Sequence, residues 1–144
     1  MRSIMVLLVV LLINSCGTGI ISYDKPFYEK VTGIAVPVTF KVLETYDNGE
    51  DLTGTTFSTD SLSLLKFVLK YKLNKVKKVR FGDDYPGLID WGRSYIKGVM
   101  PDRNHSENLY FINTSVGKYD WVYVADVKKG ILWTLISYPD WEGD

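Results

Sequence analysis

Two neighbouring segments in the last third of the chain are apolar on both faces, and they restrict the possible fold more than any other feature. Residues 119–127 and 131–138 are rich in aromatic and β-branched residues, and Lys129 and Gly130 between them are typical of a tight turn. Antiparallel pairing about that turn predicts one face with Trp121, Tyr123, Ala125, Val127, Leu132, Thr134, Ile136 and Tyr138, and an opposite face with Val122, Val124, Asp126, Trp133 and Leu135. Because both faces are largely apolar, we expect a sheet that is covered on both sides.

A short helix and then a strand are expected before residue 43. Asp24 can cap the helix, Pro26 lies in its first turn and Gly33 can end it. Residues 36–42 then alternate between apolar and polar side chains. This period of two predicts a half-buried strand that starts at Val36.

The next turn signal is Asn48-Gly49, a pair that adopts the positive φ angles of a two-residue hairpin turn. A hairpin closed at this turn places Asp47 opposite Glu50. The same register brings side chains together on one face, pairing Val42 with Thr55 and Phe40 with Phe57.

One longer helix is expected over about residues 61–73, capped by Thr59 or Asp60. Its apolar residues cover most of the circumference and leave a polar stripe of Ser63, Lys66 and Lys70. Further strands are expected over 76–81 and 109–113, with an ambiguous, partly helical stretch over 88–97. The sequence therefore predicts one α+β domain over residues 24–144, an antiparallel sheet of about five or six strands packed on one main helix.

Composition excludes several classes of protein. The 144 residues include 17 basic and 17 acidic side chains and 14% aromatic residues, which is unlike a disordered chain. A single Cys cannot form an intramolecular disulfide. The absence of net positive charge disfavours nucleic acid as a partner.

The first sixteen residues are expected to be a targeting segment. Residues 4–13 form an unbroken apolar run of ten residues, which suits the core of a signal peptide and is shorter than a membrane span. The run ends in Ile13-Asn14-Ser15-Cys16. This ending resembles the lipobox of bacterial lipoproteins, with an aliphatic residue three positions before the Cys and a small residue just before it.

The resemblance implies that residues 1–15 are removed and that Cys16 becomes a lipidated N-terminus. Residues 16–23 would then form a short tether, anchored in the membrane through the lipid on Cys16. Gly17, where Asp would direct retention, implies the outer membrane of the bacterial envelope, facing the periplasm. The alternative is an ordinary signal peptide that is cut near Gly17 or Gly19.

The sequence offers little chemistry for catalysis. Ser63 and Lys66 match the S-x-x-K pattern of penicillin-binding enzymes, but one such match is expected by chance in a chain of this composition. His105 is the only histidine and is surrounded by loop-forming residues. We therefore expect no catalytic residue, no cofactor and no metal site.

Basic side chains are concentrated between residues 66 and 80, where no acidic residue occurs. The candidate partner-binding residues in this stretch are Lys66, Lys70, Lys75, Lys77, Lys78 and Arg80. Separated charge of this kind can attract an acidic protein or anionic lipid headgroups, whereas the simpler interpretation is a solvated face of a helix and a strand.

Three functions remain open on the sequence alone. The first is a non-catalytic binding or interaction module, an immunity or inhibitor protein for an acidic partner being its more specific form. The second is a structural or assembly accessory of an envelope complex that docks through the aromatic C-terminal sheet. The third is an enzyme, which is disfavoured because no nucleophile–base pair or metal cluster is evident.

Overall fold

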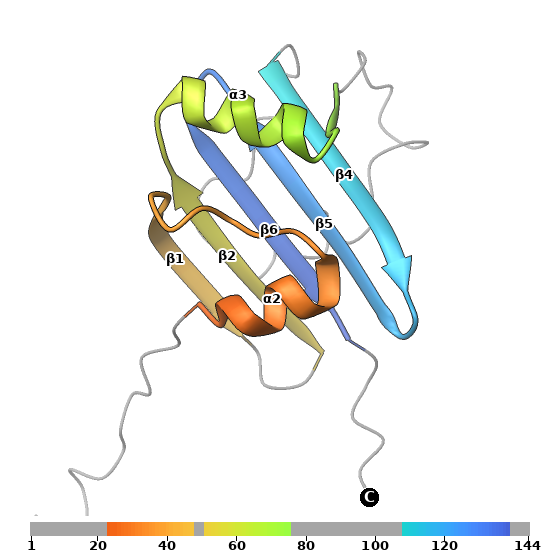
Figure 1. Ribbon diagram of the computed structural model, residues 1–144. Helices are drawn as coiled ribbons and strands as arrows, with labels where there is room; N and C mark the ends of the chain where they lie inside the picture. Colours follow the sequence, from red (N-terminus) through yellow and green to blue (C-terminus); the bar gives the residue numbers. More distant parts are fainter. Residues whose placement is uncertain (1–22, 48–50, 76–107, 139–144) are drawn as a thin grey trace, which may run out of the picture.

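The computed structural model describes residues 23–47, 51–75 and 108–138, which form an antiparallel sheet with two helices on one of its faces (Figure 1). The elements are α2 (Lys25–Thr32), β1 (Lys41–Asp47), β2 (Leu52–Ser58), α3 (Ser61–Lys70), β3 (Asn74–Lys75), β4 (Leu109–Val116), β5 (Tyr119–Asp126) and β6 (Ile131–Ser137). The strand order is β1-β2-β6-β5-β4-β3, and each pair of neighbours is antiparallel. The α+β class is confirmed, but two helices rather than one main helix pack on this sheet.

Helix α2 begins and ends where its capping residues predict. The Asp24 carboxylate accepts a hydrogen bond from the backbone N–H of Phe27 at 3.1 Å. Gly33 ends the helix with φ of 69°, a left-handed conformation that glycine adopts without strain. These signals act within one helical turn, and for this reason they can be read directly from the sequence.

Strand β1 begins at Lys41, so the prediction of a strand from Val36 is wrong. The backbone N–H of Phe40 donates to the carbonyl oxygen of Pro37 at 2.9 Å, which closes a turn over these residues. Val36 and Phe40 are buried whereas Val38 is 87% exposed. The turn directs Val36 and Phe40 inward and Val38 outward, whereas the predicted strand would have placed all three on one face.

The hairpin β1–β2 is present, but its predicted register is wrong. Asp47 pairs with Thr53, so five residues lie between them and a two-residue Asn48-Gly49 turn is excluded. The register shifts between Val42 and Glu44, and Val42 rather than Phe40 pairs with Phe57. Residues 48–50 themselves lie outside the described part of the chain.

Helix α3 ends at Lys70 rather than near Leu73. Lys72 has φ of 54°, which is incompatible with continuation of a right-handed helix. The backbone N–H of Leu73 instead donates to the carbonyl oxygen of Val68 at 3.0 Å. This turn directs Leu73 back into the core, where its side chain is buried.

The prediction of which residues of the last two strands share a face is confirmed, and both faces are buried. Asp126 pairs with Ile131, so the turn comprises residues 127–130 and is longer than Lys129-Gly130 alone. Trp121 pairs with Ile136 on the face that carries the helices, and Val124 pairs with Trp133 on the opposite face. Strand β4 continues to Val116, three residues beyond its predicted end. The strand predicted over 76–81 and the helical stretch over 88–97 lie outside the described residues.

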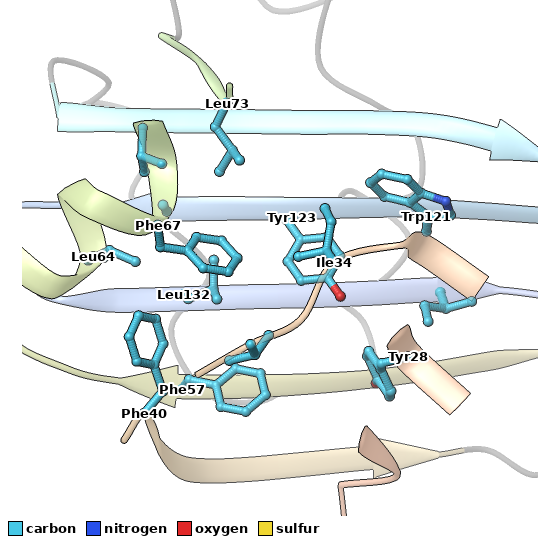
Figure 2. Packing of buried hydrophobic residues seen from close by; sticks show 14 of the residues in the cluster. Tyr28, Ile34, Phe40, Phe57, Leu64, Phe67, Leu73, Trp121, Tyr123 and Leu132 are labelled. Atoms are coloured by element: carbon cyan, nitrogen blue, oxygen red, sulfur yellow. The ribbon is translucent and has the colours of Figure 1, made fainter. Parts of the chain in front are cut away.

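Two hydrophobic clusters occupy the two faces of the sheet. The first contains the side chains that α2 and α3 bring onto the sheet, and Figure 2 shows Phe67 and Leu64 of α3 beside Tyr123 and Leu132. The second cluster comprises Leu52, Leu109, Val122, Val124, Trp133 and Leu135. Burial of each such side chain contributes roughly 1.5–3 kcal/mol to folding, so both faces stabilise the domain.

Candidate partner-binding surface

The candidate surface is built on α3, whose position in the fold is fixed from its first residue. The Asp60 carboxylate accepts a hydrogen bond from the backbone N–H of Ser63 at 2.8 Å, and bonds from Ser63 lower the pKa of Asp60. Leu64, Phe67 and Val68 are buried against the sheet. Ser63 therefore lies in the first turn of α3. This position agrees with the interpretation of the S-x-x-K match as part of a helix surface.

The opposite side of α3 exposes leucine and lysine side chains together. Leu62 and Leu69 are 62% and 68% exposed, and Lys66 and Lys70 are exposed between and beside them. Lys66 follows Leu62 by four positions, and Leu69 and Lys70 follow Lys66 by three and four, so the four residues lie on one side of the helix. We call this set of four residues the basic–apolar surface.

More apolar residues are exposed at the corner of the sheet next to the start of α3. Val38 is followed within three residues by Lys41, and Lys41 pairs with Ser58 at the end of β2. Val42 and Leu43, the next residues of this edge strand, are also exposed. Four of the six large apolar side chains that are exposed in the described residues thus lie within a few positions of this corner: Val38, Val42, Leu43 and Leu62.

The C-terminal end of α3 is attached to the segment that connects α2 with β1. The Tyr71 hydroxyl accepts a hydrogen bond from the backbone N–H of Ala35 at 3.0 Å and donates one to its carbonyl oxygen at 3.1 Å. Lys70 Nζ lies 4.9 Å from the centre of the Tyr71 ring, within the range of a cation–π contact. These contacts hold the basic end of the helix in place.

The structure locates three of the six basic residues that the sequence singles out. Lys66 and Lys70 are exposed on α3, and Lys75 is exposed in β3, where it pairs with Tyr110 of β4. Lys77, Lys78 and Arg80 lie outside the described residues, as do Cys16 and His105.

The exposure of Leu62 and Leu69 was missed, because the apolar residues of this helix were assigned together to a broad buried face. The spacing of Leu62, Lys66 and Leu69 could have separated them from Leu64, Phe67 and Val68, which recur on the opposite side of the helix.

A second group of polar side chains was also missed, a network of hydroxyls buried between α2 and the sheet. The Tyr28 hydroxyl lies 3.3 Å from Thr53 Oγ1 and accepts a hydrogen bond from Thr55 at 3.3 Å. Thr32 Oγ1 donates to the carbonyl oxygen of Tyr28 at 2.7 Å and lies 3.2 Å from the Tyr123 hydroxyl. Burial raises the pKa of Tyr28 and of Tyr123, so both side chains are neutral hydrogen-bonding groups at ordinary pH.

A separate hydroxyl contact lies at the edge of the domain, at Tyr138. Its hydroxyl donates to Asp47 Oδ1 at 3.1 Å and links the end of β6 to the end of β1. Burial and the nearby Asp47 carboxylate raise the pKa of Tyr138 to about 12. The hydroxyls between α2 and the sheet bond to one another and to the backbone, and these bonds position α2 on the sheet.

Within the three described ranges, no three side chains of His, Cys, Asp or Glu gather in an arrangement that could hold a metal ion. Neither described helix has the length and apolar character that crossing a bilayer requires. The chain matches no family model, no curated protein and no solved structure.

Proposed function

We propose that this protein is a small lipoprotein of the bacterial cell envelope that acts by binding rather than by catalysis. The proposed anchor is the lipid on Cys16, supported by the apolar run over residues 4–13 and the lipobox-like Ile13-Asn14-Ser15-Cys16. The chain then has seven residues, 16–22, before the first described residue, Tyr23. A tether of this length keeps the domain close to the membrane.

The observation that carries a binding role is the basic–apolar surface. Two leucines remain more than 60% exposed on a helix whose other side is fully buried, and lysines flank both of them. An acidic residue is absent from the whole segment 61–75. Apolar groups within a surface of one charge are typical of a contact region, because the charge orients a partner and the apolar groups are buried when it binds.

The more specific form of this proposal is an immunity or inhibitor protein. Lysines on an exposed helix attract an acidic toxin or enzyme over a distance of about one Debye length, roughly 8 Å at physiological salt. This form makes the same surface responsible for both the rate of association and the contact itself.

The competing proposal is an assembly accessory that docks through the aromatic residues of β5 and β6. Trp121, Tyr123 and Trp133 are buried in the described domain. A docking role through these side chains would require the domain to open, at a cost of several kcal/mol for large buried aromatics. Their burial therefore favours the basic–apolar surface as the contact region.

The anchor is tested by mass spectrometry of protein extracted from the membrane of a producing bacterium. We expect a mature N-terminus at Cys16 that carries the mass of the attached acyl chains. The Cys16→Ser variant serves as the control and should carry no lipid. A mature N-terminus at Thr18 or Ile20 without lipid mass would contradict the proposal.

A further inference from the structure

We propose that the basic–apolar surface rests on anionic lipid, so that the domain lies against the membrane instead of extending from it on its tether. This inference rests on the lipid anchor of the proposed function, and it assigns the basic–apolar surface to anionic lipid in place of the acidic protein of the more specific form above. It concerns Leu62, Lys66, Leu69 and Lys70 of α3, with the exposed apolar corner beside them.

The tether enters the fold on the face of the sheet that carries α3. The Tyr23 ring packs 5.0 Å from the Tyr28 ring of α2 and 4.9 Å from the Phe57 ring of β2. Phe57 belongs to the cluster beneath the two helices, and it pairs with Val42 in the exposed corner. Strand β2 ends one residue later, and α3 begins at Ser61.

The distance from Cys16 is short enough for this placement. Residues 16–22 span at most about 25 Å when fully extended, because each residue adds no more than about 3.6 Å. Helices α2 and α3 cover the same face of the sheet (Figure 1), so this face can turn toward the bilayer without the tether crossing the domain. A membrane is thus the nearest anionic surface available to α3.

The arrangement of side chains fits a bilayer better than an acidic protein. Leu62 and Leu69 are separated along α3 by about 10 Å, at about 1.5 Å per residue, and Lys66 lies between them. In a bilayer each leucine can enter the acyl boundary separately while the lysines extend to the phosphates. A protein partner would need two apolar pockets at this spacing with carboxylates between them.

The test uses a fluorescent dye that shifts to the blue in an apolar environment. The full chain carries Cys16→Ser, which removes its only cysteine, and Leu69→Cys then provides a single labelling site on α3. Leu69 is 68% exposed, so the label does not disturb the core. The matched control places the dye at Asn113→Cys, which is exposed in β4 and pairs with Val122, a residue of the cluster on the face opposite to the helices.

On vesicles of phosphatidylglycerol, we expect a blue shift for the dye at residue 69 and none for the dye at residue 113. Vesicles of phosphatidylcholine should produce a much smaller shift at residue 69. Lys66→Glu with Lys70→Glu should weaken vesicle binding by at least about 25-fold, since each lysine near an anionic surface accounts for roughly five-fold in affinity.

Three results would overturn the inference. The first is an unchanged dye at residue 69 in the presence of phosphatidylglycerol vesicles. The second is an equal shift at residues 69 and 113, which would show insertion without orientation. The third is a response at residue 69 to soluble polyglutamate but not to vesicles, which would assign the surface to an acidic protein. The labelled chains lack Cys16, so their results do not depend on the lipid anchor. The anchor is tested separately, by the mass of the natural protein.

Discussion

At the scale of single residues, Gly130 lies in the turn between β5 and β6 and contacts Thr59, the residue before the N-cap of α3. Its φ is +68°, and a Cβ atom there would lie 2.1 Å from the carbonyl oxygen of Thr59. The backbone N–H of Thr59 donates to the carbonyl oxygen of Gly130 at 2.8 Å, so neither segment can move away without losing this bond. We expect Gly130→Ala to lower the free energy of unfolding by roughly 2–4 kcal/mol, measured by urea denaturation.

The matched control for this substitution is Gly117→Ala. Gly117 also has a positive φ, +61°, but a Cβ atom there would meet nothing within 4 Å. Gly117→Ala should therefore lower the free energy of unfolding by only about 1 kcal/mol, the cost of a strained backbone conformation. Equal losses for the two variants would show that backbone strain alone, and not the contact with Thr59, explains the requirement for glycine at residue 130.

The residues that the sequence identifies correctly are those that act locally. Asp24 and Asp60 each bond to a backbone N–H three residues away, and these bonds require no knowledge of the tertiary fold. The contact of Gly130 with Thr59, and the bond between Thr32 and Tyr123, join segments that are distant in sequence. Nothing in the local pattern predicts them.

At the scale of elements, Tyr71 joins the end of α3 to the segment between α2 and β1. Tyr71→Phe removes both hydrogen bonds to Ala35 but keeps the ring, which packs 4.9 Å from the Phe67 ring. Because the groups of Ala35 can be solvated once released, we expect a loss of only about 1 kcal/mol. The amide of Ala35 should exchange its hydrogen faster, as measured by nuclear magnetic resonance.

An unchanged exchange rate at Ala35 in Tyr71→Phe would contradict this assignment. The amide of Gly33 provides an internal control, because it donates to the carbonyl oxygen of Glu29 within α2. Its exchange should stay as it is in the unaltered protein. Faster exchange at both amides would indicate that α2 itself has been destabilised.

The elements show why period and turn signals predict some strands and not others. Strands β5 and β6 are long enough for their apolar residues to determine which side chains share a face, and the observed pairs agree with that assignment. In β1 the same period of two includes a turn, and the bulge between Val42 and Glu44 changes the register. A bulge depends on the pairing as a whole, so the Asn48-Gly49 signal could not predict it.

At the scale of the whole molecule, the sequence predicts the class of fold and the existence of a basic segment, but not which of its residues form a surface. That surface depends on the end of α3 at Lys70, on the burial of Phe67 and on the position of β1. Each of these is set by tertiary packing. The leucines of the surface become identifiable only when the buried side of the helix is known.

Three tyrosines make the stability of the whole fold depend on pH in the alkaline range. Burial raises the pKa of Tyr28 and Tyr123, and burial with Asp47 raises the pKa of Tyr138 to about 12. In the unfolded chain these side chains ionise near pH 10. Above that pH the folded protein therefore binds more protons than the unfolded chain, so stability that is fully present below pH 10 is lost as the pH rises.

We accordingly expect the free energy of unfolding to be nearly constant between pH 8 and about 9.5 and then to fall with pH, by up to about 1.4 kcal/mol per pH unit for each fully buried tyrosine. Urea denaturation across this range measures the slope. Tyr123→Phe removes one of the responsible hydroxyls, and it should flatten the slope above pH 10 even where its stability at pH 8 is lower, because the bond to Thr32 is lost. An identical slope in the two proteins would mean that ionisation of Tyr123 does not accompany unfolding, and that its hydroxyl reaches solvent in the folded state.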